Sequence, residues 1–188
     1  NSLRRTLMTS VPGAAITSIK VDGVSHEFSI INGVTEDVSD LILNLKQVRF
    51  KLDDIGPETI NLKLKGPCTF TGKDINKASE MFEVLNENLH LANLTEKADF
   101  TIEIQISRGK GYTSSEKNKR TDVPLGTIFI DSIYNPITNV TFDVSTLPTS
   151  TDGLEMLSLE VKSDGSTSPR DAINHAASII RQQLALFM

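Results

Sequence analysis

Hydrophobic and polar residues change their spacing twice along the 188-residue chain, which divides it into helical ends and a strand-rich middle. Near the start, Leu3, Leu7 and Val11 recur at helical spacing until Pro12 and Gly13 interrupt the pattern. This spacing predicts a short helix with one apolar face. Near the end, a serine cap is followed by proline, which predicts a terminal helix of about 20 residues, roughly 30 Å long. The apolar face of that helix consists of Ile173, Ala176, Ala177, Ile180, Leu184 and Phe187.

Between these two helices, alternation of apolar and polar residues predicts a series of antiparallel strands. Residues 36–45 are the exception, because an acidic start and apolar residues at helical spacing predict a helix there. Residues 109–124 are polar and rich in turn formers, so we expect a loop. Helical ends around a strand-rich middle predict an α+β fold. The predicted strands are 15–21, 26–31, 48–52, 60–65, 82–94, 100–106, 127–133, 140–144 and 157–161.

Composition and charge narrow the possible functions. The chain carries a formal charge of -5, and an acidic surface repels phosphate backbones, which argues against autonomous nucleic-acid binding. One cysteine, Cys68, allows no internal disulfide and, with three scattered histidines, no zinc site, which fits a reducing compartment. No apolar run is long enough for a membrane span or a signal peptide. We expect a cytoplasmic protein without cofactor or metal.

No catalytic motif is present. The segment Arg108-Gly109-Lys110-Gly111 lacks the spacing of a phosphate-binding loop. Cys68 is interpreted as a small core residue, with a nucleophile as the alternative. The pairs Glu36/Asp37 and Asp53/Asp54 have structural explanations at a helix start and a turn, with acid–base chemistry as the alternative. His175 lies beside the apolar face of the last helix and is interpreted as a surface residue.

Three features allow either a structural or a binding interpretation. Arg4 and Arg5 lie on a short helix whose other face is apolar, so they are either solvated or part of a docking surface. The segment 108–112 is either a hairpin connection or an interaction loop, because Arg and Tyr favour protein interfaces. The last helix stays apolar through Leu184, Leu186, Phe187 and Met188, which indicates core packing or a two-fold helix–helix dimer.

Several segments resemble one known family, in order and over essentially the whole chain. Residues 1–7, 12–16 and 21–28 resemble the opening helix and first strands of the bacterial RNA polymerase alpha subunit. Residues 33–38 and 43–46 resemble its next helix, and 108–112 its Arg-Gly-x-Gly-Tyr loop. Residues 131–137 and 164–177 resemble the return into its first subdomain and its last helix.

This resemblance implies a fold with two subdomains. Residues 1–12 and 136–188 would form an α/β dimerisation subdomain, and residues 13–135 a mostly-β subdomain inserted into it. The family has a strand-forming segment before Asn1 and a DNA-binding domain after the last helix, and neither is in this sequence. We therefore expect no promoter contact by that route. Residues 113–122 do not resemble the family pattern, so activator contacts are not carried over.

The resemblance also implies a function. The alpha dimer of this family nucleates polymerase assembly by binding the beta and beta-prime subunits, without catalysing the reaction. Its source would be bacterial, with an organellar origin also open. An independent nucleic-acid-binding or transcription-factor module, and a small enzyme, are the alternatives. The implied dimer contacts are Leu3, Leu7, Ile173, Ala176, Ile180 and Leu184. The implied contacts with the beta and beta-prime subunits are Arg4, Arg5, Asn44, Lys46, Arg108, Lys110 and Tyr112.

Overall fold

The computed structural model describes residues 1–52, 58–147 and 153–187 of the chain. Helices are combined with antiparallel sheets, so the predicted α+β class is confirmed. The chain forms two compact units, Asn1–Val11 with Asn135–Met188 (unit 1) and Pro12–Tyr134 (unit 2). Each unit has its own cluster of buried apolar side chains.

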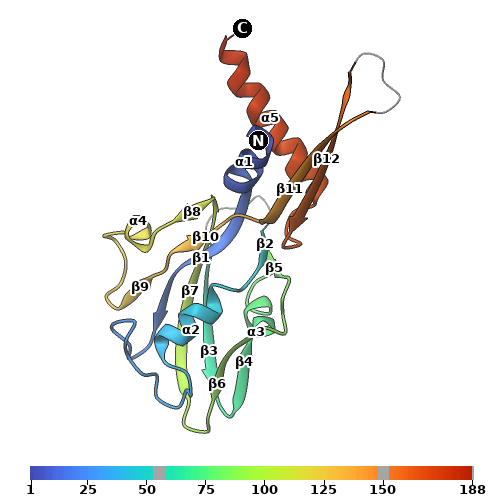
Figure 1. Cartoon of the computed structure of the whole chain (residues 1–188). Helices are drawn as coiled ribbons and strands as arrows, with labels where there is room; N and C mark the ends of the chain where they lie inside the picture. The colour runs from blue at the N-terminus through green and yellow to red at the C-terminus, as the bar shows by residue number, and fades with distance from the viewer. Residues whose placement is uncertain (53–57, 148–152, 188) are drawn as a thin grey trace. The chain divides into compact units, whose positions relative to one another are not determined.

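Unit 1 combines three helical elements with one hairpin (Figure 1). In the hairpin, β11 (Ile137–Thr146) pairs antiparallel with β12 (Glu155–Ser163). Helix α1 (Ser2–Ser10) packs with α5 (Pro169–Leu184), and the short 3-10 helix η1 (Ala185–Phe187) continues α5. The core of unit 1 is small, and its buried members are Leu7, Val11, Ile137, Val140, Ala172 and Ala176.

The start of α5 follows from its sequence. The Ser168 hydroxyl accepts a hydrogen bond from the Asp171 backbone N–H at 3.1 Å, and Pro169 occupies the first helical position. Such a cap satisfies a backbone donor that the helix leaves free, and proline has no donor to lose there. The predicted helix start is therefore confirmed, whereas the α-helix is 16 residues long rather than about 20.

Unit 2 is built on a four-stranded antiparallel sheet with the order β3-β7-β1-β9. Three short two-stranded ribbons, β2–β5, β4–β6 and β8–β10, complete its strands. The sheet strands are β1 (Pro12–Val21), β3 (Glu58–Lys65), β7 (Asp99–Lys110) and β9 (Thr127–Phe129). The ribbon strands are β2 (Phe50–Leu52), β4 (Cys68–Thr71), β5 (Phe82–Val84), β6 (His90–Leu94), β8 (Tyr112–Thr113) and β10 (Ser132–Ile133). Its helices are α2 (Val38–Leu45), α3 (Gly72–Asn76) and α4 (Ser115–Asn118).

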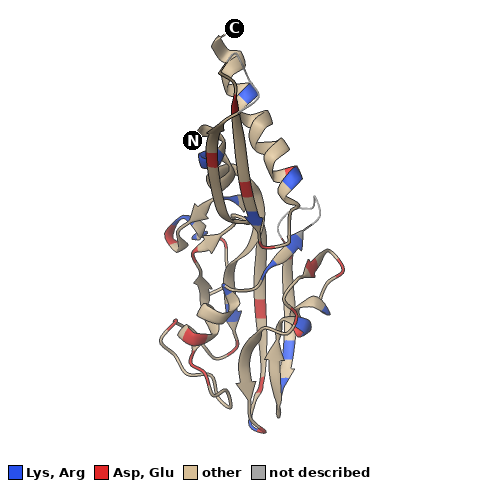
Figure 2. Ribbon diagram, turned by 45° about the vertical axis from the view of Figure 1, so that its right-hand side comes forward, with Lys and Arg blue, Asp and Glu red and all other residues tan. Residues whose placement is uncertain are grey.

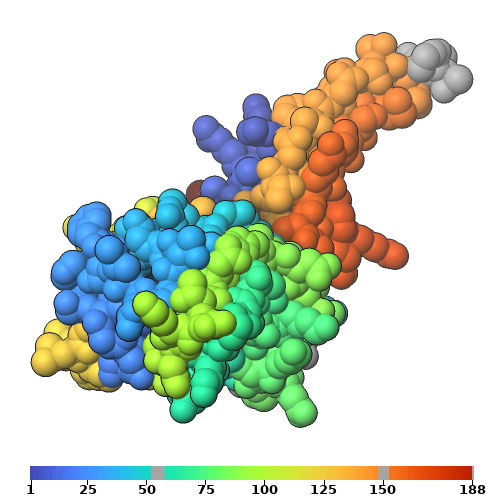
Figure 3. Space-filling model, turned by 90° about the horizontal axis from the view of Figure 1, so that it is seen from below, coloured from blue at the N-terminus to red at the C-terminus, as the bar shows by residue number. Residues whose placement is uncertain are grey.

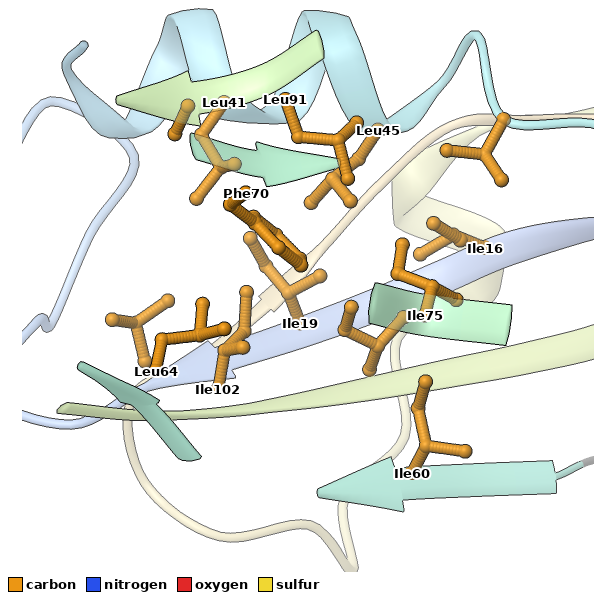
Figure 4. Packing of buried hydrophobic residues seen from close by; sticks show 14 of the residues in the cluster. Ile16, Ile19, Leu41, Leu45, Ile60, Leu64, Phe70, Ile75, Leu91 and Ile102 are labelled. Atoms are coloured by element: carbon orange, nitrogen blue, oxygen red, sulfur yellow. The ribbon is translucent and has the colours of Figure 1, made fainter. Parts of the chain in front are cut away.

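One face of this sheet is apolar and covered. The side chains of Ile102, Ile104 and Ile106 alternate onto that face of β7 and are fully buried. Phe70 of β4 lies between Leu41 of α2 and Ile19 of the sheet (Figure 4). The intervening residues of β7 are polar and half-buried, so the core of unit 2 lies on one side of the sheet.

Several predicted elements differ from the structure. The predicted strand 26–31 is wrong: these residues form turns and one isolated bridge between Ile30 and Asp37. The reason is that β1 already has β7 and β9 as its two neighbours. The predicted helix 36–45 begins at Val38, because the Asp37 carboxylate caps the helix by accepting from the Asp40 backbone N–H. The expected single strand 82–94 is split into β5 and β6, and the expected loop 109–124 contains β8 and α4.

Candidate interaction surfaces

The two arginines of α1 have different surroundings in unit 1. The Arg4 Nε donates a hydrogen bond to the Val140 carbonyl oxygen of β11 at 3.1 Å, which ties the helix to the hairpin. The Arg5 side chain is exposed. Arg4 therefore has a structural contact, and Arg5 is the better candidate for contact with another protein.

The side chains expected at a dimer interface fall into three groups. Leu7 and Ala176 are fully buried in the core of unit 1. They therefore do not lie on the surface of the unit and can support an interface only from beneath it. Leu3, Ile173 and Ile180 are half-buried. The third group is exposed: Leu184 at 58%, followed by Leu186 at 79% and Phe187 at 88%. The apolar surface is therefore concentrated at the end of α5.

The hairpin of unit 1 is also unusually apolar on its surface. Figure 3 shows β11 and β12, in orange, as a narrow ribbon open to solvent on the side facing the viewer. Its exposed apolar residues are Phe142, Val144, Leu147, Leu154, Met156 and Leu157. Val144 pairs with Leu157, so these two lie together on one face with Phe142. Met156 lies on the other face, because it pairs with Ser145. Exposed apolar groups of this kind are typical of surfaces that another chain covers.

The end of α2 is anchored to two other parts of unit 2. The Asn44 side-chain amide donates to the Leu91 carbonyl oxygen of β6 at 2.9 Å. Lys46 Nζ lies 2.6 Å from Asp131 Oδ2, and this ion pair lowers the pKa of Asp131 below its ordinary value of 3.8. Asp131 directly precedes β10, so the pair fixes the distance between α2 and the β8–β10 ribbon.

A double-mutant cycle of Lys46→Met and Asp131→Asn is expected to show a favourable coupling of about 0.5–1 kcal/mol. The pair is partly exposed, with side-chain accessibilities of 24% and 37%, so solvent and salt screen it. The measurement is the free energy of unfolding in urea at low and high salt. A coupling of zero at low salt would contradict the structural role of the pair.

The segment 108–112 joins the sheet to the β8–β10 ribbon. Arg108 and Lys110 end β7, Gly111 has a positive φ of 62°, and Tyr112 then pairs with Ile133 of β10. A Cβ atom at Gly109 would lie 2.6 Å from the Tyr134 ring, so glycine is needed for the ring to pack there. The segment is therefore a tight connection between strands, which also presents exposed side chains of Arg108, Lys110 and Tyr112.

The sequence pattern did not identify Asp131 or Ile133 as members of this surface, nor Tyr134 as the buried residue that packs beneath it. Ile133 is 51% exposed beside Tyr112, and the Tyr134 hydroxyl lies 2.9 Å from the Ser107 hydroxyl. All three fall in the segment 131–137, whose only signal in the sequence is its resemblance to the family. The strand pairing that brings them to Tyr112 is non-local, so spacing along the chain carried no signal for it.

Glu36 fastens the start of the α2 segment to β6. Its carboxylate accepts from the Asn93 backbone N–H at 2.7 Å and from His90 Nε2 at 2.9 Å. Burial raises the pKa of Glu36, but these hydrogen bonds outweigh it and hold the pKa below the ordinary value of 4.5. Ionised Glu36 therefore stabilises the fold.

This stabilisation is expected to be complete above pH 4.5 and to be lost as the pH falls through the lowered pKa of Glu36. A Glu36→Gln variant should be less stable than the parent at neutral pH, and the difference should shrink in acid. The measurement is the free energy of unfolding across this pH range, with the exposed residue Glu96 changed to Gln as the control. A pH-independent difference would contradict the assignment.

The remaining candidates for chemistry have structural surroundings. Residues 1–52, 58–147 and 153–187 hold no group of three or more His, Cys, Asp or Glu side chains arranged for a metal ion. The prediction of Cys68 as a core residue is wrong, because Cys68 is exposed on β4, and its Sγ lies 3.4 Å from the Lys65 carbonyl oxygen. His175 is exposed, as predicted, and the pair Asp53/Asp54 lies outside the described residues. No helix in the described part of the chain is long and apolar enough to cross a membrane.

Comparison with known families gives a match over most of unit 2. Residues 19–135 match the family described as the RNA polymerase Rpb3/RpoA insert domain. The matched residues make up more than half of the 188-residue chain, so the match is sufficient to assign the chain to a family.

Individual relatives match the whole chain. It is 48% identical over 191 residues to the DNA-directed RNA polymerase subunit alpha of Salinibacter ruber, covering 100% of the chain and 58% of that protein. The subunit of the same name from Leptospira biflexa is 47% identical over 192 residues, covering 100% and 59%. That of Chloroherpeton thalassium is 45% identical over 188 residues, covering 100% and 57%. The chain thus spans less than two thirds of the length of these relatives.

Proposed function

Since this chain belongs to the bacterial RNA polymerase alpha subunit family and carries its insert domain, we propose that it is an assembly scaffold of DNA-directed RNA polymerase. The observation that carries the proposal is the family match over residues 19–135, together with relatives that align with 100% of the chain. In this function the protein forms a homodimer and binds the beta and beta-prime subunits, without contributing catalytic groups. A cytoplasmic location follows from that function.

The assignment of dimerisation to unit 1 is supported by the end of α5. Leu184 is 58% exposed, and Leu186 and Phe187 continue the apolar surface along η1. Ile180 lies one helical turn before Leu184 and is half-buried, so the apolar stripe is continuous. A stripe of this kind is self-complementary across a two-fold axis, since the same residues meet from both copies.

The assignment of partner binding to Arg5 is supported by its exposure. Guanidinium groups present several donors in a fixed plane and are common at protein interfaces. Arg4 is bound to the Val140 carbonyl oxygen and serves the fold of unit 1 instead. In Figure 2, charged residues of both signs are distributed along the chain. Arg5 therefore contributes to binding through its own contacts with the partner rather than through a long-range electrostatic field.

The test is co-purification of the complete protein with a tagged beta subunit, in the parent and in Arg5→Ala. The parent is expected to be retained, and Arg5→Ala to be retained at least about tenfold less while remaining dimeric. Arg170→Ala, which removes an exposed arginine elsewhere in unit 1, is the matched control and should behave as the parent. A folded, dimeric parent that is not retained would show the assembly role to be wrong. Equal retention of the parent and Arg5→Ala would be consistent with the assembly role, but it would show that Arg5 does not contribute to binding the beta subunit.

A further inference from the structure

The segment between β1 and α2 in unit 2 contains the single Asn-Gly dipeptide of the chain, Asn32-Gly33. These two residues are the centre of a turn, which a hydrogen bond from the Val34 N–H to the Ile31 carbonyl oxygen closes at 3.1 Å. Gly33 has a φ of 81°, and a positive φ at the third residue is characteristic of a type II turn. The Asn32 side chain is exposed. A solvent-accessible carboxamide therefore lies directly before a residue that has no side chain.

The packing of unit 2 requires glycine at position 33. A Cβ atom there would collide with the backbone nitrogen of Ala98, and a side chain would also be strained at this positive φ. The Gly33 carbonyl oxygen accepts hydrogen bonds from the Thr95 N–H at 2.8 Å and from the Thr95 hydroxyl at 2.9 Å. The turn is therefore fastened to the residues that follow β6, and no larger residue can shield the amide after Asn32.

The Gly33 backbone nitrogen is available to react with the Asn32 side chain. The bond that closes the turn uses the Val34 N–H instead, and the Gly33 N–H donates no hydrogen bond within residues 1–52, 58–147 and 153–187. Asn88 is also exposed, but Leu89 after it carries a side chain and donates its N–H to the Asn86 carbonyl oxygen at 2.9 Å. Asn32 is therefore more open to attack by the amide that follows it than Asn88 is.

We propose that Asn32 is a site of spontaneous covalent modification, at which the carboxamide is converted to aspartate or isoaspartate. The Gly33 nitrogen forms a bond to Cγ of Asn32 while the bond from Cγ to Nδ2 breaks, and ammonia leaves with the proton of the Gly33 N–H. Water then opens the resulting cyclic imide at either carbonyl carbon, so the net change is the gain of water and the loss of ammonia. Opening at the main-chain carbonyl gives isoaspartate, whose main chain runs through Cβ and Cγ and is longer by one methylene group.

The isoaspartyl product releases the turn from its place in unit 2. Ile31 before the site is buried, and Gly33 after it is held by Thr95 and packed against Ala98. An added methylene group between Ile31 and Gly33 therefore displaces one of these contacts. The aspartyl product adds a charge at an exposed position and leaves the length of the main chain unchanged. The modification concerns the chemistry of this chain alone, so it does not depend on the assembly function.

The test incubates the folded, complete protein at mildly acidic and mildly alkaline pH and follows the peptides that contain Asn32 and Asn88 by mass spectrometry. Conversion at Asn32 should be at least about tenfold faster than at Asn88, where the side chain of Leu89 hinders the approach of the reacting atoms. It should also be faster at the higher pH, because the attacking amide must lose its proton. Asn32→Gln is the matched variant and should stay unmodified, since its longer side chain closes a ring less readily. Conversion at Asn32 no faster than at Asn88 overturns the proposal.

Hydrogen exchange of the Thr95 N–H, which donates to the Gly33 carbonyl oxygen, measures the structural consequence. Its protection should fall in the aged parent in proportion to the isoaspartate content, and it should persist in aged Asn32→Gln. Freshly prepared Asn32→Asp, which adds the charge without lengthening the main chain, should also keep this protection. Full protection of Thr95 in isoaspartyl protein, or its loss in fresh Asn32→Asp, overturns the inferred release of the turn by main-chain lengthening.

Discussion

Replacing Leu7 with alanine is expected to unfold unit 1 while unit 2 stays folded. The Leu7 side chain is fully buried, and two of the six buried residues in its cluster are alanines. Truncating a buried leucine costs about 2–5 kcal/mol, from lost apolar burial and from the cavity that remains. A core this small gives unit 1 a low free energy of unfolding, so the loss is a large fraction of that free energy. The proposed dimerisation should fail with it, since α1 packs against α5.

Hydrogen exchange of both units measures this expectation directly. In Leu7→Ala, amides of α1, β11 and α5 should exchange rapidly, and those of β1 and β7 should keep their protection. Leu3→Ala is the matched control on the same helix, because Leu3 is half-buried and its truncation should cost less. Protection of α5 equal to that of the parent would contradict the role of Leu7 in the core of unit 1.

The second large effect is expected from Phe70→Ala in unit 2. Phe70 is 1% exposed and lies between α2 and the sheet, where it contacts the buried isoleucines and leucines of both layers. Truncation of a buried phenylalanine costs about 3–5 kcal/mol. The layer formed by α2 and the β4–β6 ribbon should separate from the sheet in a larger fraction of molecules, which exposes the surface around Lys46.

The free energy of unfolding in urea, followed by circular dichroism, measures this loss. Phe100→Ala provides the comparison, because Phe100 is half-buried at the edge of the same core and should cost clearly less. Equal losses for the two variants would mean that the position of Phe70 between the layers has no special importance.

The parts of the fold that could be predicted are those specified by local sequence. The cap at Ser168, the alternation in β3 and β7, and the apolar face of α2 depend on residues close in the chain. Strand 26–31 was predicted wrongly because Phe28 and Ile30 alternate with polar residues as in a strand, yet both are 80% exposed. Whether such a segment joins a sheet depends on a free neighbouring strand, which sequence spacing does not reveal.

The candidate surfaces divide in the same way. Arg5 and Tyr112 were identified from residue type and family resemblance. Two further features depend on contacts between distant segments and could not be predicted. One is the difference between Arg5 and Arg4, and the other is the pairing of Tyr112 with Ile133. The apolar stripe of α5 was predicted as one surface, whereas burial separates Ala176 in the core from Leu184 on the surface.

The composition of the complex formed with the large subunits tests the central claim most directly. Native mass spectrometry of the complete protein mixed with purified beta subunit measures how many copies bind. The proposed scaffold predicts a dimer on its own and a complex of two copies with one beta subunit. A monomer that binds one beta subunit, or a dimer that binds none, would contradict it.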